Sequence, residues 1–187
     1  FGVWQRLIGL GAHMVRGPSD LALGMLRVRD MSPRNAREEV RLVTFLRTQQ
    51  ALGDVVCRRL AELPSTLVVS LDDKSGVMVM HGSPSDEYGG LVDDEHLPHE
   101  VDCIAEDVLV CGSTHRAFLR RLDRRVDHAG TPLLVVNCGS VGVSPVRTEA
   151  HGRTAHAVLV VPCDDGVVRA FPRDVPIAAS ERVRRAG

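Results

Sequence analysis

Aromatic residues are scarce in this sequence, and long apolar runs and an excess of either charge are absent. Each of these features argues against a class of structure or function. Aromatic residues make up 3% of the 187 residues, so the core must be built from Val, Leu, Ala and Met, and an aromatic-rich interaction surface is disfavoured. No apolar run approaches the ~20 residues of a membrane span, and because no basic segment followed by an apolar one opens the sequence, we expect no signal peptide. A formal net charge of -1 gives no support for a nucleic-acid or membrane surface.

Paired cysteines are also missing. The cysteines are odd in number and none belongs to a Cys-x-x-Cys pair, which disfavours a disulfide framework. They are Cys57, Cys103, Cys111, Cys138 and Cys163. The expected location is therefore the reducing cytoplasm, and each cysteine is interpreted as a small buried apolar side chain.

The first third of the chain is predicted to be mostly helical. Residues 3–10 have helix-like apolar spacing, and Ala12–Val15 is a short strand candidate. Ser32-Pro33 predicts a helix start, with Ser as the cap and Pro at the first helical position. The inward side chains expected for this helix are Ala36, Val40, Val43, Phe45 and Leu46. A second helix is expected from about Gln50 to Leu60, with Leu52, Val55, Val56 and Leu60 inward and Leu63-Pro64 as its end.

The remainder of the chain is predicted to be rich in strands. Thr66–Leu71 and Val77–Met80 form an expected hairpin around residues 72–76. Further strands are expected at Asp107–Cys111, Phe118–Leu122, Leu133–Asn137, Ala157–Val161 and Val167–Phe171, with a tight turn at 164–166. Residues 82–100 are expected to form a surface loop and residues 176–187 a solvated tail. Helices followed by strands predict a layered α/β or α+β sandwich, in one domain of residues 1–187.

Three of the predicted strands end in polar turns that contain glycine. These turns are His81-Gly82-Ser83-Pro84, Gly112-Ser113-Thr114-His115 and Asn137-Cys138-Gly139-Ser140. Neighbouring strand ends in a parallel or mixed sheet line one crevice, so we expect the three turns to meet there. Glycine permits the close approach that a cradle of backbone amides needs, and Asn137, Gly139 and Ser140 can add donors to such a cradle.

His81 and His115 each follow a strand and lie close to a glycine. Such positions suit a metal ligand or a donor to phosphate. The alternative for each is a turn histidine that is hydrogen-bonded to the backbone, and the spacing leaves both interpretations open. His13, His96 and His99 are candidate substitute ligands, with a plain surface histidine as the alternative for each.

In this order the motifs resemble the calcineurin-like metallophosphoesterase superfamily, in particular its small bacterial phosphoesterases. That family reads His-Gly, then Gly-His-Thr-His, then Asn-Pro-Gly-Ser-Val-Gly, and Arg16–Asp20 falls where it has Gly-Asn-His followed by Asp or Glu. The resemblance covers about residues 1–161. It implies an α/β fold, a β-sandwich of two mixed sheets flanked by helices. Residues 1–30 would then be a remnant of the N-terminal half, 31–64 a helical segment and 65–175 the strand-rich C-terminal half.

The resemblance implies a two-metal hydrolase, in which two ions clamp the phosphate and generate a hydroxide nucleophile. By this resemblance His81 would ligate one metal and His115 the other, and Asp20 would orient the family's catalytic histidine. The turns on the phosphate side would be formed by Gly82, Gly112, Asn137, Gly139 and Ser140.

The sequence departs from the family at its ligand positions. The family's Asn ligand falls at Pro18, its catalytic His at Ser19 and the first His of Gly-His-Thr-His at Ser113. The opening Asp-x-His and Gly-Asp-x-x-Asp motifs are absent, so the N-terminal part is interpreted as truncated. A catalytic metal usually needs three or more protein ligands, and the site that would use Pro18, Ser113 and His81 keeps only His81. The expected cofactor is one divalent cation of the manganese, iron or zinc class, or none.

The expected function is that of a metallophosphoesterase-family protein with impaired or lost hydrolase activity, which binds a protein partner or a phosphate-bearing small molecule. Ser19 in place of the acid/base histidine would alone cost about 10²–10⁴ in rate. One alternative is an active phosphoesterase whose N-terminal ligands lie outside this sequence; two metals per chain would favour it. Another is a structural or interaction module, favoured by a stable complex that changes at His81 and His115 leave intact.

Overall fold

The computed structural model of the chain describes residues 1–71, 75–124, 132–141, 154–164 and 167–176. The chain divides into two compact units, Phe1–Leu67 and Val68–Gly187. The division falls inside a strand, close to the change from helical to strand-rich sequence. The predicted tail and parts of the turns at 72–76 and 164–166 lie outside the described residues.

The first unit is helical. Its elements are α1 (Gly2–Gly9), α2 (Pro18–Met25), a 3-10 turn η1 (Val28–Asp30), α3 (Ala36–Leu52) and α4 (Asp54–Ala61). Helices α2 and α4 cross closely at Gly24, where an added Cβ would lie 2.5 Å from Ala61 Cβ and 2.7 Å from the Cys57 carbonyl oxygen. Only glycine fits that crossing without displacing α4. None of the described helices combines the length and the apolar character that crossing a membrane requires.

Two predictions for this unit are wrong, and a third holds only in part. Ala12–Val15 is not a strand, because its neighbour Arg16 makes a single backbone bond to the Pro64 carbonyl (2.9 Å) and no ladder follows. The helix predicted from Ser32-Pro33 begins at Ala36 instead. Its apolar residues are inward only in part: α3 has no buried residue, Phe45 and Leu46 are half-buried, and Val40 and Val43 are 66% and 42% exposed.

The second predicted helix is divided differently from the prediction. Helix α3 continues to Leu52, and Gly53, with φ +81°, separates it from α4. Of the side chains predicted to face inward, Val56 is buried but Val55 is 65% exposed, whereas Cys57 is buried. The apolar positions therefore marked the helix correctly but its buried face only in part.

The N-cap of α3 provides a test that separates the predicted start from the observed one. The Asn35 side chain accepts a hydrogen bond from the Glu38 N–H (2.9 Å), which satisfies one of the free amides of the first turn. We expect Asn35→Ala to lower the free energy of unfolding of this unit by about 1 kcal/mol. The control Ser32→Ala should change it by less than about 0.5 kcal/mol. Urea denaturation followed by far-ultraviolet circular dichroism measures both, and equal effects would contradict the cap at Asn35.

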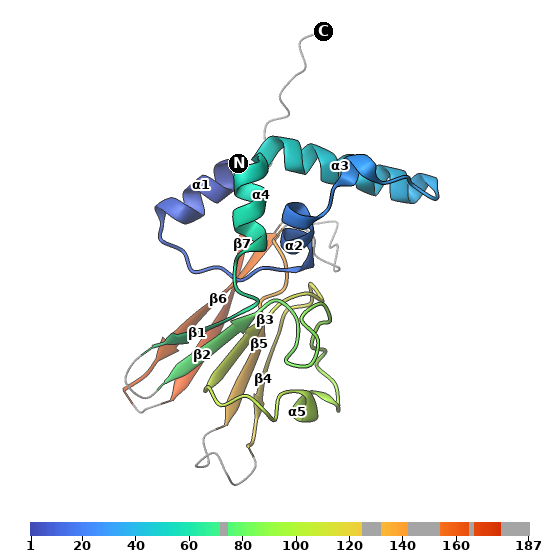
Figure 1. The fold of residues 1–187 in the computed structure, drawn as a ribbon. Helices are drawn as coiled ribbons and strands as arrows, with labels where there is room; N and C mark the ends of the chain where they lie inside the picture. Colours follow the sequence, from blue (N-terminus) through green and yellow to red (C-terminus); the bar gives the residue numbers. More distant parts are fainter. Residues whose placement is uncertain (72–74, 125–131, 142–153, 165–166, 177–187) are drawn as a thin grey trace. The chain divides into compact units, whose positions relative to one another are not determined.

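The second unit is built on a five-stranded sheet in the order β1-β2-β3-β5-β4 (Figure 1). Its strands are β1 (Thr66–Ser70), β2 (Gly76–Met80), β3 (Val108–Cys111), β4 (Phe118–Leu122) and β5 (Leu133–Asn137). Strands β2, β3 and β5 are parallel, and β4 pairs antiparallel with β5. These strands lie where the apolar runs predicted them, including the neighbouring pair β1 and β2.

A second sheet covers one face of the first and makes a sandwich. It consists, among the described residues, of β6 (Thr154–Pro162) paired antiparallel with β7 (Val168–Pro176). One core lies between the sheets and contains Val77, Val108, Leu134 and Val136 from the first sheet against Val158, Val160, Val168 and Ala170. Each side chain comes from alternate positions along its strand. The α/β sandwich is thus confirmed, although the second sheet is antiparallel rather than mixed where it is described.

The opposite face of the large sheet is covered by the segment that the sequence predicts as a surface loop. Residues 82–100 include the short helix α5 (Leu97–Glu100), and Leu91 and Leu97 are both 0% exposed. They pack with Val101, Ile104, Leu109, Cys111, Leu133 and Val135 in the second core. The prediction fails because the polar and turn-forming residues around these two leucines hide the fact that both leucines complete the core. Both faces of β3 and β5 are consequently buried, as their unbroken apolar runs require.

Candidate functional site at the carboxyl ends of the parallel strands

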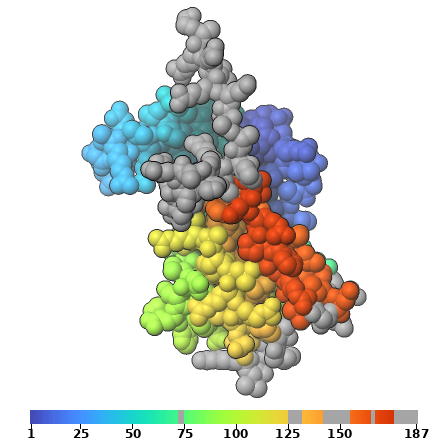
Figure 2. Space-filling model, turned by 180° about the vertical axis from the view of Figure 1, so that it is seen from behind, coloured from blue at the N-terminus to red at the C-terminus, as the bar shows by residue number. Residues whose placement is uncertain are grey.

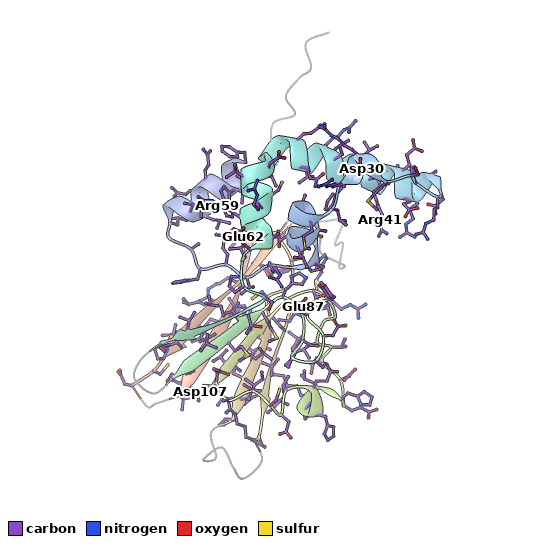
Figure 3. The ribbon with its side chains drawn as sticks, in the orientation of Figure 1. Asp30, Arg41, Arg59, Glu62, Glu87 and Asp107 are labelled. Carbon is purple, nitrogen blue, oxygen red and sulfur yellow. The ribbon has the colours of Figure 1, made fainter. Side chains whose placement is uncertain are left out.

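The three predicted turns follow β2, β3 and β5, whose parallel pairing puts their carboxyl ends at one edge of the sheet. Hydrogen bonds join each turn to the next: the Gly112 N–H donates to the His81 carbonyl (3.0 Å), and the Cys138 N–H donates to the Cys111 carbonyl (3.1 Å). The expectation that these turns meet in space is confirmed. In Figure 3, the labelled Glu87 belongs to the loop that follows β2 and lies at this edge of the sheet. The labelled Asp107 precedes β3 and lies at the opposite end of that strand.

The Gly112–His115 turn has an unusual backbone. Ser113 and His115, neither of them glycine, have φ values of +64° and +59°. The Thr114 N–H donates to the Gly112 carbonyl across Ser113 (2.8 Å), which closes a three-residue turn. Left-handed conformations at side-chain-bearing residues cost free energy and persist only where the surroundings enforce them. Something in the neighbouring structure must therefore hold this turn.

Asn137 is the residue that holds it. The side chain is 1% exposed, and its Nδ2 donates to the Gly112 carbonyl (2.8 Å) and to Thr114 Oγ1 (3.0 Å). Its Oδ1 accepts from the Gly139 N–H (2.9 Å). The amide thus satisfies groups of two turns at once, in a place from which water is excluded. Asn137 and the Gly139 N–H act inside the protein, whereas the sequence predicts them as donors toward a ligand.

The donors that the turn leaves available come from other atoms. The backbone N–H groups of Ser113 and His115 have no hydrogen-bond partner within the part of the chain that the structure describes. Gly112 adds no side chain, and a Cβ there would lie 3.5 Å from the His81 carbonyl oxygen and 4.0 Å from His81 Nδ1. The His81 imidazole is therefore next to the turn, half-buried, and His115 is exposed. Ser113 Oγ donates to the Tyr88 carbonyl (3.4 Å).

The cysteines of this region are not nucleophiles. Burial raises the pKa of the Cys111 thiol to about 12, and the neighbouring Cys138 raises it further while Asn137 lowers it. Burial likewise raises the pKa of Cys138. A thiol with a raised pKa is protonated at neutral pH, and only the thiolate is nucleophilic. All five cysteines are free, which agrees with their interpretation as apolar residues for the buried Cys57 and Cys111; Cys103, in contrast, is exposed.

The chain is similar to solved structures, among them the following two. One is a hypothetical protein of Pyrococcus horikoshii, with a TM-score of 0.62 and 20% identity over 92% of this chain and 66% of that chain. The other is a metallophosphoesterase from Sphaerobacter thermophilus, with a TM-score of 0.59 and 18% identity over 86% of this chain and 64% of that chain. The chain has the metallophosphoesterase fold. It spans just under two thirds of the length of each of these two structures, at 66% and 64%. No protein-family model and no curated protein matches the sequence.

The remaining positions that the metallophosphoesterase resemblance singles out belong to the first unit. Pro18, Ser19 and Asp20 form the first turn of α2. Asp20 Oδ2 accepts a hydrogen bond from the Gly17 N–H (2.8 Å), so this carboxylate caps its own helix. Of the candidate substitute ligands, His13 is exposed in the first unit, and His96 and His99 are exposed at α5 in the second.

The donor set does not fit the two-metal centre that the metallophosphoesterase fold implies. The edge offers His81 and His115, while Ser113 contributes a hydroxyl that is hydrogen-bonded to Tyr88. Within the described ranges no group of three or more His, Cys, Asp or Glu side chains is placed to hold a metal ion. Such a centre requires at least three protein ligands for each ion, carboxylates among them.

Sequence reasoning missed two features of this region. One is His156, whose side chain lies against Gly139: a Cβ at Gly139 would be 3.1 Å from His156 Cγ and Cδ2. The other is Asp174, whose Oδ1 lies 2.8 Å from His156 Nδ1. A signal for this pair exists in the sequence, because extending the two predicted strands away from the predicted turn at 164–166 pairs His156 with Asp174.

Proposed function

We propose that this chain is a metallophosphoesterase-fold domain that binds a phosphate-bearing small molecule at the edge formed by the turns after β2, β3 and β5. We propose also that its hydrolase activity is impaired or lost and that it acts in the cytoplasm, as its free cysteines favour. The observation that carries the proposal is the Gly112–His115 turn. Its left-handed backbone leaves the Ser113 and His115 N–H groups unpaired within the described residues, beside the imidazoles of His81 and His115.

This arrangement suits an oxyanion. Unpaired backbone amides in a turn provide directed donors for anions, and two imidazoles at strand ends add donors and, when protonated, positive charge. Arg116 follows directly and is exposed. Asn137 and Gly112 keep the turn in shape, so its donors are already oriented before a ligand arrives.

The impairment follows from the positions that have changed. Ser113 and Pro18 stand where the resemblance implies a histidine and an asparagine ligand, and Ser19 stands where it implies the acid/base histidine. A hydroxyl that is hydrogen-bonded to a backbone carbonyl is a poor replacement for an imidazole ligand. Loss of acid/base assistance alone lowers a rate by about 10²–10⁴. A bound divalent cation, if this domain takes one, would have fewer protein ligands than the family provides.

Titration with inorganic phosphate, followed by amide signals in nuclear magnetic resonance, tests the binding. We expect the signals of Gly112–Arg116 and His81 to shift, and His115→Ala to weaken the affinity by at least about fivefold through a lost donor. His96→Ala removes an imidazole that is 72% exposed and should leave the affinity unchanged. Shifts that are absent from the turn, or equal in the two variants, would contradict the proposed site.

A separate assay tests the impairment. The purified chain is incubated with Mn²⁺ and a generic aryl phosphodiester, and release of the aryl alcohol is measured. We expect a rate close to that of the metal alone. Robust manganese-dependent hydrolysis that His81→Ala abolishes would overturn the proposed impairment and support an active phosphoesterase.

A further inference from the structure

The β6–β7 ribbon carries an imidazole–carboxylate pair that touches the candidate site. His156 on β6 and Asp174 on β7 face each other directly in the antiparallel register. His156 Nδ1 lies 2.8 Å from Asp174 Oδ1, and the two side chains are 21% and 74% exposed. The carboxylate accepts from Nδ1–H, which fixes both the tautomer and the direction of the ring.

The same histidine holds the turn after β5. Its backbone N–H donates to the Ser140 carbonyl (3.1 Å). Its ring fills the space beside Gly139, where an added Cβ would be 3.1 Å from Cγ and Cδ2. Gly139 has φ +77°, so this position needs glycine both for its backbone and for the closeness of the ring.

From that turn the contacts continue to the candidate site. The Gly139 N–H donates to Asn137 Oδ1 (2.9 Å), and Asn137 Nδ2 in turn donates to the Gly112 carbonyl and to Thr114 Oγ1 (2.8 and 3.0 Å). Those groups set the left-handed geometry at Ser113 and His115. One packing contact and one buried side chain therefore connect the His156 ring to the turn that carries the unpaired amides.

We propose that the His156–Asp174 pair positions the Gly112–His115 turn. The proposal rests on the proposed function, because it makes the pair a support of the same ligand-binding edge. The Asp174 carboxylate fixes the direction of the His156 ring, and the ring in turn fills the space beside Gly139 and supports the turn after β5.

The Asp174 carboxylate is the principal charged neighbour of His156. A cavity of about 290 Å³ lies beside the ring, and Figure 2 shows the orange-red ribbon next to the yellow β4 segment in this region. Its titratable or charged lining residues, apart from His156, are Cys138 after β5 and Arg173 and Asp174 on β7, whereas β4 and its approach contribute Ala117, Phe118 and Leu119. Arg173 is directed elsewhere, since its guanidinium donates to the Pro172 carbonyl (3.1 Å) and lies 5.9 Å from the centre of the Phe171 ring.

Amide signals recorded on the full chain without ligand, at one fixed pH, test the proposal. We expect Asp174→Ala, which removes the partner of the His156 ring, to shift the Gly139 and Thr114 amide signals. The matched control is Asp164→Ala, which removes another exposed carboxylate of the ribbon and should leave both signals unchanged.

Two variants at the histidine complete the test. His156→Ala should shift the Gly139 and Thr114 amide signals and weaken phosphate affinity by about fivefold. His156→Gln keeps a hydrogen-bonding side chain and should restore part of both. If the Gly139 signal shifts in His156→Ala while the Thr114 signal does not, the coupling is refuted, whatever phosphate does. If wild-type protein shows no phosphate shift at residues 112–116, the proposed function fails, and the Thr114 signal still decides the coupling.

Discussion

Replacing Asn137 with leucine should destabilise the second unit by roughly 3 kcal/mol, the largest effect we expect from a change at the candidate site. The substitution keeps an apolar volume at a position that is 1% exposed. It leaves the Gly112 carbonyl and the Gly139 N–H without their partner, and a buried polar group without a partner costs about 1–3 kcal/mol. Urea denaturation measures the loss, and the left-handed turn should relax, which changes the amide signals of Ser113 and His115.

Two further variants measure how much the individual hydrogen bonds of Asn137 contribute to stability. Thr114→Val removes one of the three partners and should cost about 1 kcal/mol. Asn137→Asp keeps the acceptor for the Gly139 N–H but loses both donors and brings a charge into the interior, so it should cost about as much as leucine. If Asn137→Leu were no more destabilising than Thr114→Val, the side chain would not be what holds the turn.

Leu91→Ala should lower the stability of the second unit by about 3 kcal/mol. Leu91 is 0% exposed and packs in the core that covers the outer face of β3 and β5. Truncation removes the transfer free energy of its methyl groups and leaves a cavity that its neighbours fill only in part. Denaturant unfolding followed by circular dichroism is again the measurement.

The adjacent residue supplies a matched control. Val92 is 47% exposed in the same segment, so Val92→Ala should change stability by less than about 0.5 kcal/mol. A similar small effect for both residues would mean that residues 82–100 behave as the surface loop that the sequence predicts.

The sequence predicted an element well where interactions between residues close in the sequence determine it, and poorly where packing between distant residues determines it. Strand β5 matches its predicted bounds because an apolar run that is buried on both faces has few other solutions. Strand β4 also matches its predicted bounds, although it is an edge strand with alternating exposure. The cap of α3 was misplaced by three residues, since Ser32 and Asn35 are equally good caps and the choice depends on the whole helix. Leu91 was missed because its burial depends on long-range packing across the sheet, which no window of sequence reveals.

The same distinction between local and long-range interactions applies to the candidate site. Strand-end motifs were enough to bring His81, Gly112 and Asn137 to one edge, because parallel pairing follows from the alternation of strands and connections. The partners of the hydrogen bonds were not predictable. The Asn137 side chain does not point donors at a ligand but binds the Gly112 carbonyl and accepts from the Gly139 N–H, and so it holds the two turns together. His156 and Asp174 stayed hidden because the predicted strands of the ribbon were too short to include either residue.

Strand β4 ends the large sheet and has consequences for how copies of this chain meet one another. Its pairing with β5 uses one side of its backbone, and the order of the described strands gives it no neighbour on the other. A bare strand edge is a template onto which further chains can be added. Arg120 and Arg121 lie in the middle of this strand, and Arg120 is also tied to Asp93 (3.0 Å). These two adjacent arginines repel the same strand of a second molecule. The outer edge of the sheet therefore disfavours the edge-to-edge pairing of chains from which fibrils grow.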